Sequence, residues 1–440
     1  MVPILSDGSG RDTRGALLAP GMRHRHYGAF FELGKPYLTI RKVAVGAPLS
    51  ASLSLVLVAG KVTDSVTSGF LPAAARLSAM AGTAPVTLLT DRPAEHAEVF
   101  DGPIVACDVT DYREIIARCE DLAPAAFFSN SDFLQAPTAL AAAYHGLPGK
   151  DWRAATRAKN KALMRRHLAG VDPVFSAAAE RVPEDAPYPL VLKPREGVAS
   201  EDVFLVQDAA ELAIRCEEIR ARRSDPLVVE EYLPGELHTL ETLGDGRELR
   251  VLGSFHTTVS PPPYFIEERL AWAPPPPETE QVLAQLDALG VGFGACHTEF
   301  VVHEGRARLI EVNYRLIGDH CDFLMADLLG APLFDWILRV HMGEPLPPYE
   351  PPANDAGRTA VAEVVLAERP GVLTAAPDAT ELTDGSVTVS YRPQRKVGEQ
   401  IALTRTNRDY LGTIRAIGPS EDKVEATLKR FRAAYSWTIQ

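Results

Sequence analysis

The sequence lacks several features that define particular classes of protein. Its 440 residues include only five cysteines, and no two of them form a Cys-x-x-Cys pair, so neither a disulfide framework nor a zinc ribbon is expected. The most apolar stretch, Leu53–Ala59, is far too short to span a bilayer. The first residues also lack a basic start followed by an apolar run. We therefore expect a soluble protein of the reducing cytoplasm with no membrane partner.

Positive charge is also in short supply. The chain has 45 Lys and Arg against 58 Asp and Glu, which gives a formal net charge of −13. Because nucleic-acid binding normally needs a basic face, we expect no nucleic-acid partner, and an anionic nucleotide would need local positive charge. The hydrophobic share of 46% and the charged share of 23% are typical of a globular protein, and the length allows two or three domains.

Strand-like and helix-like segments alternate in the first third of the chain. The pattern predicts, in order, a strand at Leu53–Ala59, a helix at Leu71–Ala81, strands at Val86–Thr90 and Pro103–Ala106, a helix at Tyr112–Glu120, a strand at Ala125–Ser129 and a helix at Leu134–His145. Such alternation is typical of a doubly wound parallel sheet, so we predict a Rossmann-like domain over residues 1–150. Residues 1–50 carry few periodic signals, and their basic cluster Arg23–Tyr27 is either a surface patch or part of an edge element.

The loop Ser129–Asp132 follows the last of these strands, at the edge where parallel sheets present groups to ligands. Its residue types are also those that begin helices, and we favour this second role, as the N-cap of the next helix. Further on, Gly146–Gly149 interrupts the pattern and indicates a domain boundary near residue 150.

The most basic stretch of this acidic chain lies just after that boundary. A helix predicted at Arg157–Leu168 carries Lys159, Lys161, Arg165 and Arg166. A run of bases is usually a solvated face, but it also supplies the local positive charge that a bound nucleotide would need.

Two later strands end in residues suited to nucleotide contacts. A short strand over residues 189–192 ends at Lys193, and the loop Arg195–Asp202 leads from there to a second strand. A lysine ammonium beside the backbone N–H groups of a loop can hold phosphates, although an ordinary hairpin connection explains this loop equally well. The strand Leu227–Glu231 runs into Pro234-Gly235, which leaves backbone groups free to read an adenine edge.

The stretch His297–His320 carries the most specific pattern. Strand-like runs at Thr298–His303 and Ala307–Val312 flank a turn at Glu304–Arg306, which predicts a β-hairpin. A three-residue loop would oppose three pairs directly: Val301 with Leu309, Glu299 with Glu311, and His297 with Asn313. The period of two then puts the last two pairs and Arg315 on one face.

Two carboxylates directly opposite each other repel unless something positive lies between them. Glu299 and Glu311, with the amide oxygen of Asn313, are hard oxygen donors that suit Mg²⁺ or Mn²⁺ better than zinc. Arg315 can neutralise a phosphate held by the same ions. The alternative is a solvated face on an ordinary hairpin, but such a face more often mixes Lys and Thr with its acids than sets Glu against Glu.

The remaining segments complete the outline. They predict helices at Ala209–Arg222, Glu278–Leu289 and Ala326–Met342, and strands at Leu237–Leu243 and Arg250–His256. Beyond Pro345–Pro348, strands at Ala360–Leu366 and Ser386–Tyr391 and a helix at Asp422–Tyr435 predict a smaller α+β module.

Taken in order, these pieces resemble the ATP-grasp superfamily, most closely over about residues 150–345. The wording HTEFVV…RLIEVNYR is most similar to the carboxylate–amine ligase branch, which includes the L-amino-acid ligases. The resemblance implies an ATP-grasp domain at 151–345, between a Rossmann-like pre-ATP-grasp domain at 1–150 and an α+β cap at 346–440. It also implies ATP and Mg²⁺ or Mn²⁺ as cofactors.

The resemblance further implies roles for individual residues. The metal ligands would be Glu299, Glu311 and Asn313, and the catalytic residue Arg315. From its place opposite Asn313, His297 is a second catalytic candidate that would orient a substrate carboxylate or the γ-phosphate; the alternative is that it packs under the metal site. The nucleotide would be bound by Lys161 and Lys193, by the flap residues Gly197 and Ser200, and by the adenine hinge Glu230, Glu231, Tyr232 and Leu233. The family's ribose-binding Glu falls on Leu237 here, so Glu236 or His238 would take that role, or the ribose is held differently.

As a function, the resemblance implies an ATP-dependent ligase that forms an amide through an acyl phosphate and releases ADP and phosphate. The expected partners are a small-molecule carboxylate and amine, whose identities the sequence does not give, with a homodimer left open. One rival is an enzyme of the same fold that carboxylates or phosphorylates its substrate, as biotin carboxylase does. Another is a non-catalytic module that senses ATP, which the intact metal ligands disfavour.

Overall fold

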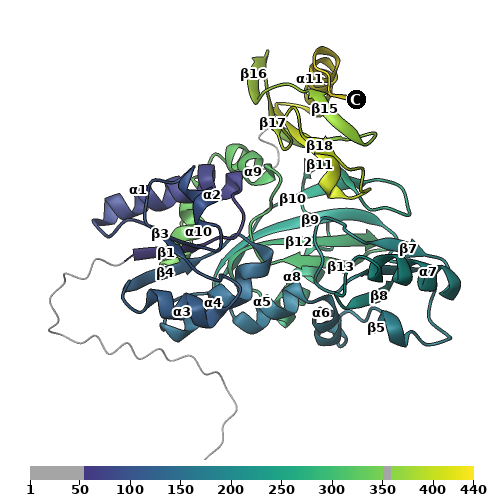
Figure 1. Cartoon of the computed structure of the whole chain (residues 1–440), viewed down its shortest axis with the longest axis horizontal. Helices are drawn as coiled ribbons and strands as arrows, with labels where there is room; N and C mark the ends of the chain where they lie inside the picture. The colour runs from purple at the N-terminus through teal and green to yellow at the C-terminus, as the bar shows by residue number, and fades with distance from the viewer. Residues whose placement is uncertain (1–53, 350–357) are drawn as a thin grey trace, which may run out of the picture. The chain divides into compact units, whose positions relative to one another are not determined.

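The computed structural model of this chain describes residues 54–349 and 358–440 (Figure 1). The predictions for residues 1–50, including the basic cluster Arg23–Tyr27, lie outside the described residues. Within the described part, no helix is both long and apolar enough to cross a membrane. The described strands form one sheet of nine strands, two of four and one of three.

The predicted parallel sheet is present. Its strands are β1 (Ser54–Val58), β2 (Thr87–Thr90), β3 (Ile104–Ala106) and β4 (Pro124–Phe128), in the order β3-β2-β1-β4 with every neighbouring pair parallel. Strands β1 and β2 are buried along their whole length, as their apolar runs predict. The chain winds outward from β1 to β3 and then returns to the other side of β1, so the topological switch point lies between β1 and β4.

Helices cover this sheet where the sequence predicts them, with one short addition: α1 (Leu71–Ala81), the unpredicted α2 (Pro93–Ala97), α3 (Tyr112–Cys119) and α4 (Gln135–Tyr144). Another helix comes from much later in the chain, because α10 (Leu333–His341) packs against α1 and β4. The ring of Phe70 lies 4.3 Å from that of Phe128 and 4.9 Å from that of Phe334, centroid to centroid. Residues distant in sequence therefore complete this core.

The chain breaks where a single helix is predicted at Arg157–Leu168. It forms α5 (Trp152–Lys159) and α6 (Lys161–Leu168) instead, so that prediction is wrong. Asn160 between them has φ −100° and ψ 101°, and its side chain accepts a hydrogen bond from the backbone N–H of Leu163. Asparagine is a favoured N-cap because its oxygen satisfies a free N–H of the first turn, so Asn160 starts a new helix here.

A small antiparallel sheet follows these helices. Its order is β5-β8-β6-β7, and its strands are β5 (Ser176–Ala178), β6 (Leu190–Pro194), β7 (Phe204–Val206) and β8 (Leu227–Glu231). Helix α7 (Ala209–Arg220) packs against β7. Strands β6 and β8 pair directly, with Lys193 opposite Val228 and Val191 opposite Glu230. The predicted lysine and the predicted hinge therefore lie on neighbouring strands.

The largest sheet has nine strands, all antiparallel to their neighbours. In spatial order they are β13 (Arg306–Asn313), β12 (Phe293–His303), β9 (Glu236–Asp245), β10 (Leu249–Val259), β11 (Glu267–Ala273), β14 (Thr359–Leu366), β19 (Tyr410–Gly418), β17 (Val387–Pro393) and β16 (Thr380–Asp384). The pairing of β11 with β14 places strands from both sides of residue 345 in one sheet. Backbone hydrogen bonds thus cross the domain boundary that we expect there.

Three helices, α5, α6 and α8 (Thr279–Leu289), cover one face of β9, β12 and β13. Phe300, Leu309 and Val312 point into the core between these helices and the sheet. Since side chains alternate along a strand, the neighbours of these residues point to the opposite face, where the site lies.

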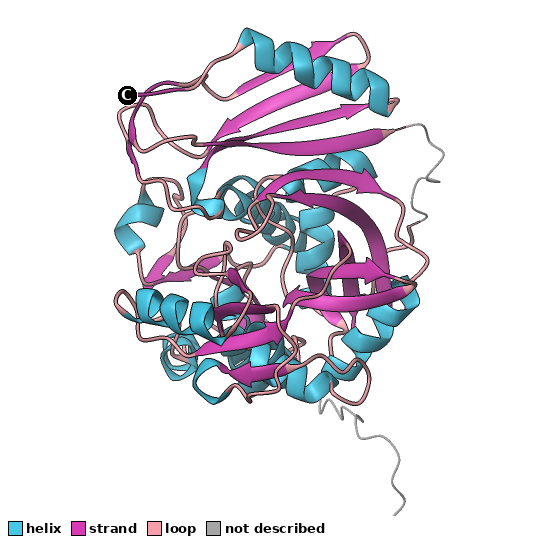
Figure 2. Ribbon diagram, turned by 90° about the vertical axis from the view of Figure 1, so that its right-hand side faces the viewer, coloured by secondary structure: helices cyan, strands magenta, loops and turns pink. Residues whose placement is uncertain are grey.

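The end of the chain covers the far part of the large sheet. Helix α11 (Glu421–Ala434), at the top of Figure 2, packs on β14, β17 and β19. A three-stranded sheet of order β18-β15-β20 lies beside them, formed by β15 (Gly371–Ala375), β18 (Gln400–Ile401) and β20 (Thr438–Ile439). The predicted α+β cap is therefore present, with its strands built into the large sheet. Short 3₁₀ or π turns occur at η1 (Ser65–Phe70), η2 (Asp132–Leu134), η3 (Ala179–Arg181) and η4 (Asn407–Asp409).

The single helix predicted at Ala326–Met342 is also wrong. The chain forms α9 (Cys321–Leu329) and then α10, with a break at Gly330–Pro332. Gly330 has φ +61°, a left-handed conformation that ends a helix, and Pro332 precedes the first residue of the next one.

The large sheet gives a test of packing at Gly253 on β10. A Cβ added there would lie 1.8 Å from the indole ring of Trp272 on β11, whereas one added at Gly170 would meet nothing within 4 Å. We expect Gly253→Ala to lower the free energy of unfolding by about 1–3 kcal/mol, because the indole must move. Gly170→Ala should leave it unchanged or raise it slightly. Urea unfolding of both variants measures the difference, and equal stabilities would contradict this account of the packing.

Candidate active site

The predicted hairpin forms, and its register is confirmed where the acids lie. His297 pairs with Asn313, and Glu299 with Glu311. The turn is shorter than predicted, since only Glu304 and Gly305 separate β12 from β13. A bulge next to Glu299 leaves one extra residue on β13, so Val301 faces Arg308 and the predicted Val301–Leu309 pair is wrong.

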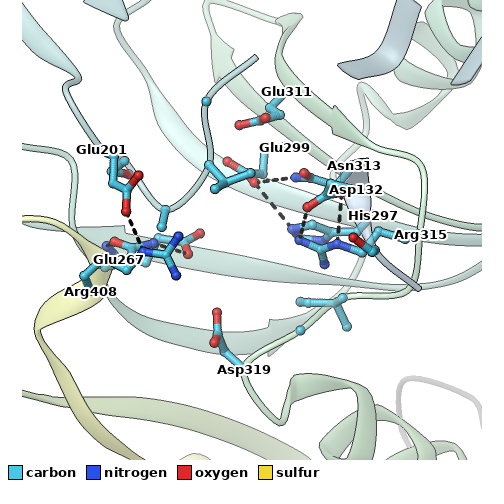
Figure 3. A pocket seen from close by; sticks show the side chains of 18 of the residues that line it. Asp132, Glu201, Glu267, His297, Glu299, Glu311, Asn313, Arg315, Asp319 and Arg408 are labelled. Atoms are coloured by element: carbon cyan, nitrogen blue, oxygen red, sulfur yellow. Dashed lines mark hydrogen bonds and ion pairs between the residues drawn. The ribbon is translucent and has the colours of Figure 1, made fainter. Parts of the chain in front are cut away.

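One cavity of about 880 Å³ collects nearly all of the predicted site residues. It is lined by residues of the hairpin, of the small sheet, of the flap and of the loops at the carboxyl ends of the parallel strands. The predicted residues among them are Lys161, Lys193, Gly197, Ser200, Glu230, Glu231, Tyr232, Leu233, His297, Glu299, Glu311, Asn313 and Arg315. Figure 3 shows the hairpin residues clustered around Arg315 and Asp132.

The two opposed carboxylates each have a cationic neighbour. Lys161 Nζ lies 2.8 Å from Glu311 Oε1. On the other side, the Nε2 atom of His297 lies 3.5 Å from Glu299 Oε1, and the amide of Asn313 donates to that same oxygen over 3.0 Å. The repulsion expected between the acids is thus reduced by groups from α6 and β12.

His297 is held between two carboxylates. Its Nδ1 lies 2.7 Å from Glu241 Oε1 on β9, in addition to its contact with Glu299. Burial alone would lower the pKa of His297, but Glu241 and Glu299 outweigh this effect and raise the pKa to about 10. The ring is therefore an imidazolium at neutral pH, and it can fix the orientation of Glu299.

The donors on this face fit a hard divalent cation. Glu299, Glu311 and Asn313 supply carboxylate and amide oxygens from adjacent strands, and Mg²⁺ usually completes such a set with waters and substrate phosphates. No group of three or more His, Cys, Asp or Glu residues that could hold a metal ion occurs in the described residues, and the donor set of the hairpin is two Glu and one Asn.

Arg315 forms a bidentate ion pair with Asp132. Its Nε and Nη2 lie 3.0 and 3.1 Å from the two carboxylate oxygens, and the neighbouring Leu316 N–H donates to Asn130 Oδ1 over 3.0 Å. Burial alone would raise the pKa of Asp132, but Arg315 outweighs it and lowers this pKa. Ser131 makes no side-chain cap, so the N-cap role favoured for this loop is wrong. The loop is instead part of the site.

A buried lysine that the sequence analysis does not single out connects these elements. Lys150 Nζ donates to Gln135 Oε1 over 2.6 Å and to the backbone carbonyls of Ala295 and Tyr314. Gln135 donates in turn to the carbonyl of Ser129, at the start of the Asp132 loop. Burial lowers the pKa of Lys150 to about 7. Its only sequence signal is its place directly after the glycine-rich break.

At the end of the cavity lined by the small sheet, Glu230 is buried between two cations. Its Oε2 lies 2.7 Å from Lys193 Nζ and 2.8 Å from Arg165 Nη2. Burial alone would raise the pKa of Glu230, but Arg165 and Lys193 outweigh it and lower the pKa to about 2. Arg165 and Lys161 are buried here, which excludes the solvated-face reading for these two bases. The side chain of Glu230 thus fixes the positions of Lys193 and Arg165.

Glu236 and His238 do not line the cavity, whereas Leu237 between them does. The side chain of Glu236 is 77% exposed, and the ring of His238 stacks 5.8 Å from that of Phe300 on the opposite face of the sheet. The alternation of β9 explains this result. The structure therefore does not support the expected ribose role of Glu236 or His238.

The loop Arg195–Asp202, which contains the flap Gly197–Ser200, is held from two sides. The Asn160 amide donates to Glu196 Oε1 over 2.6 Å, beside the junction of α5 and α6. On the other side, the backbone N–H of Asn407 donates to the Ala199 carbonyl over 3.0 Å, and the Ser200 hydroxyl donates to the Phe265 carbonyl over 2.8 Å. Ser200 lines the cavity, and its hydroxyl is bonded to protein.

Some cavity residues, among them Glu267 and Arg408, were missed from the sequence. They lie further along the cavity, as does Asp319 (Figure 3). Burial and then the nearby Glu299 raise the pKa of Glu267 to about 8, and the amide of Asn407 donates to its carboxylate over 3.1 Å. The strand that carries Glu267 was not predicted, and residues near 408 come from the cap, so no local pattern connected them to the hairpin.

Comparison with known proteins agrees with this geometry. Residues 158–260 match the model of the ATP-grasp domain. The chain therefore carries an ATP-grasp domain, and its fold is that of the ATP-grasp enzymes. It is also 28% identical over 317 residues to the uncharacterised protein y4rH of Sinorhizobium fredii, an alignment that covers 67% of this chain and 64% of that relative's length.

Solved structures give the same fold. The L-amino acid ligase from Bacillus licheniformis matches with a TM-score of 0.71 and 20% identity, over 89% of this chain and 99% of that one. The biotin carboxylase domain of 2-oxoglutarate carboxylase from Hydrogenobacter thermophilus, in complex with MgADP, ADP and bicarbonate, matches with a TM-score of 0.64 and 17% identity, over 88% of this chain and 91% of that one. At these sequence identities, the structural similarity establishes the fold alone.

The buried ion pairs of Glu230 give a stability prediction. We expect Glu230→Gln to lower the free energy of unfolding by about 3–5 kcal/mol at neutral pH, because Arg165 and Lys193 would remain buried without their anion. Urea unfolding measures this loss. The exposed Glu236 provides the matched control, and Glu236→Gln should change stability by less than about 0.5 kcal/mol.

The lowered pKa of Glu230 also predicts that the stability loss in Glu230→Gln depends on pH. The pKa of Glu230 falls from 4.5 to about 2 on folding, so its contribution is complete above pH 4.5 and is lost as the pH falls toward 2. The stability difference between the unmodified chain and Glu230→Gln should shrink over that window. A difference that stays constant from pH 6 to pH 3 would contradict the assigned ion pairs.

Proposed function

We propose that this protein is an ATP-dependent carboxylate–amine ligase that forms an amide or peptide bond through an acyl phosphate. The observation that carries the proposal is the union, in one cavity, of two directly opposed carboxylates, Asn313, two buried lysines and the partly buried Arg315. Phosphoryl transfer needs charge neutralisation and positioning more than covalent help from the protein, and these side chains supply both.

The proposed reaction has two steps. A substrate carboxylate oxygen attacks the γ-phosphorus of ATP, and the bond to the β-phosphate oxygen breaks to release ADP. The amine nitrogen of the second substrate then attacks the acyl carbon, phosphate leaves with the bonding electron pair, and the amine loses a proton. Overall, one ATP is converted to ADP and phosphate for each amide formed.

The residues of the chain divide this work. Glu299, Glu311 and Asn313 would hold Mg²⁺ or Mn²⁺, which neutralises phosphate oxygens when bound. Lys161 and Lys193 would contact the nucleotide phosphates, with the flap Gly197–Ser200 over them.

The other roles lie at the two ends of the cavity. Arg315, whose orientation is fixed by its ion pair with Asp132, would bind the acyl phosphate. It would also bind the oxyanion that forms when the amine attacks the acyl carbon. His297 would hold the carboxylate of Glu299 in place through the contact of its Nε2 with Oε1. The backbone of the hinge Glu230–Leu233 would meet the adenine.

The nearest alternative is a carboxylation that begins from bicarbonate, since the biotin carboxylase fold is also similar. The wording of the hairpin, with His297-Thr298-Glu299 before the turn and Asn313-x-Arg315 after it, favours the amino-acid ligase branch. A non-catalytic ATP sensor is disfavoured because such a module has no need of paired metal ligands.

We expect Glu311→Gln to reduce ADP formation by roughly 10²–10³-fold or more, because it removes charge that neutralises the phosphates. Nucleotide binding should survive in weakened form. The measurement is coupled ADP release together with calorimetric ATP binding, and Glu304→Gln in the exposed turn is the control. Near-normal turnover of Glu311→Gln with Mg²⁺ would eliminate the metal role of this hairpin.

The reaction class has its own test. With ATP, Mg²⁺ and the correct carboxylic acid, hydroxylamine should trap the acyl phosphate as a hydroxamate, and bicarbonate should not be required. A screen of amino acids and small polycarboxylic acids, read by phosphate release and product mass, would find the substrates. Phosphate release that depends on bicarbonate, with no hydroxamate from any acid, would exclude the ligase and leave the fold and the metal site.

A further inference from the structure

The segment between the hairpin and α9, residues 314–320, forms one wall of the cavity. Four of its residues line the cavity, and Figure 3 labels the first and the last of them: Arg315, Ile317, Gly318 and Asp319. Asp319 and His320 have φ angles of +53° and +64°, a left-handed conformation that is costly for residues other than glycine. Such a backbone persists only where its surroundings hold it. The contacts that hold residues 314–320 therefore decide where Arg315 lies.

Buried cations in this protein fall into two groups. Lys161, Arg165 and Lys193 are buried, and each lies within 2.8 Å of a glutamate oxygen. Lys150 and Arg415 are also buried, each 7% exposed, but neither forms an ion pair with a carboxylate of the described residues. Burial of a cation without an anion costs stability. Stability therefore does not explain why these two side chains are charged.

These two cations contact the two ends of the segment 314–320. The Nζ atom of Lys150 donates to the backbone carbonyl of Tyr314, and Nη1 of Arg415 donates to the backbone carbonyl of His320 over 3.3 Å. Lys150 comes from the loop between α4 and α5, whereas Arg415 comes from β19 in the cap. The segment that carries Arg315 is thus held at one end by each of the two flanking parts of the chain.

Each cation is also fixed by a second contact. Lys150 Nζ donates to Gln135 Oε1 over 2.6 Å, and Nε of Arg415 donates to the hydroxyl of Ser390 on β17 over 3.2 Å. Neither Lys150 nor Arg415 lines the cavity, so neither is placed to touch a substrate. An effect of either side chain on the reaction would have to pass through the segment between them.

We propose that Lys150 and Arg415 are positioning residues for Arg315, one acting from the end of the parallel-sheet domain and the other from the cap. The proposal rests on the role proposed above for Arg315 in the reaction. A charged donor makes a stronger hydrogen bond to a carbonyl than a neutral donor does, so both ends of the segment are firmly fixed. Within that frame, the ion pair with Asp132 sets the direction of the guanidinium.

The first test separates turnover from nucleotide binding. With ATP, Mg²⁺ and the acid found by the hydroxamate screen, Lys150→Met and Arg415→Met should each lower kcat for ADP formation by about 10–100-fold, because a small displacement of Arg315 misplaces it against the phosphoryl group. The dissociation constant of ATP, measured by calorimetry, should change by less than about threefold, since the lost interaction acts on the reacting state. Near-normal kcat in both variants would overturn the proposal.

A double-mutant cycle tests whether the two cations act through Arg315. In a chain that already carries Arg315→Met, adding Lys150→Met or Arg415→Met should lower kcat by less than about twofold, because no guanidinium remains to be misplaced. An equal loss of kcat with and without Arg315 would show that the two cations act on the fold at large, and would overturn the proposal.

Two controls accompany these variants. Gly253→Ala tests the effect of lost stability and Lys423→Met the loss of an exposed charge, and both should keep kcat, since neither residue lines the cavity. Where a methionine variant does not fold, Lys150→Gln and Arg415→Gln take its place. A glutamine amide leaves no unpaired charge but is a weaker donor, so kcat should still fall.

Failure of the proposed function gives a different result. Normal ADP formation by Arg315→Met alone would remove the role of Arg315 and the positioning proposal with it. If the unmodified chain forms no hydroxamate and releases ADP only with bicarbonate, the ligase proposal fails. The same variants, assayed with bicarbonate, would then still decide whether Lys150 and Arg415 act through Arg315.

Discussion

The ion pair between Arg315 and Asp132 is the interaction on which the arrangement of the site depends. It joins the end of the β12–β13 hairpin to the loop after the last parallel strand, so two sheets with different topologies share one cavity wall. The side chain of Lys150 connects the same two elements, because its Nζ donates to Gln135 Oε1 and to the backbone carbonyl of Tyr314. The ion pair fixes the orientation of the Arg315 guanidinium, because both oxygens of the Asp132 carboxylate accept hydrogen bonds from it.

Around this junction, the site stores charge in pairs. Glu299 and Glu311 would repel each other, and each has a cation beside it. Lys161 from α6 contacts Glu311, and the imidazolium of His297 on β12 contacts Glu299. Glu230 is surrounded in the opposite sense, as one anion between two cations. A phosphate chain entering this cavity would therefore compete for lysines that already have partners. A divalent ion held by Glu311 would free Lys161 for the phosphates, whereas Lys193 would stay paired with Glu230.

Much of this site could be predicted from the sequence because the patterns that indicate it lie within short segments of the chain. The hairpin has period two and a short turn, and those properties were enough to place Glu299 opposite Glu311. The break at Asn160 was hidden because its neighbours are good helix formers, and only the cap geometry separates the two helices. The role of Asp132 depends on a partner 183 residues away, which no local pattern can reveal. The continuity of the large sheet across residue 345 was hidden for the same reason.

The bulge beside Glu299 has a consequence for how this hairpin can vary. It separates the strand pairs near the turn from the pairs that carry the acids, because Ile310 has no partner across the ladder. The outer segment can therefore have its own offset, and the loop at Glu304-Gly305 can lengthen or shorten while the carboxylates remain opposed. That tip is therefore a suitable place for attaching a fluorescent reporter without displacing the carboxylates.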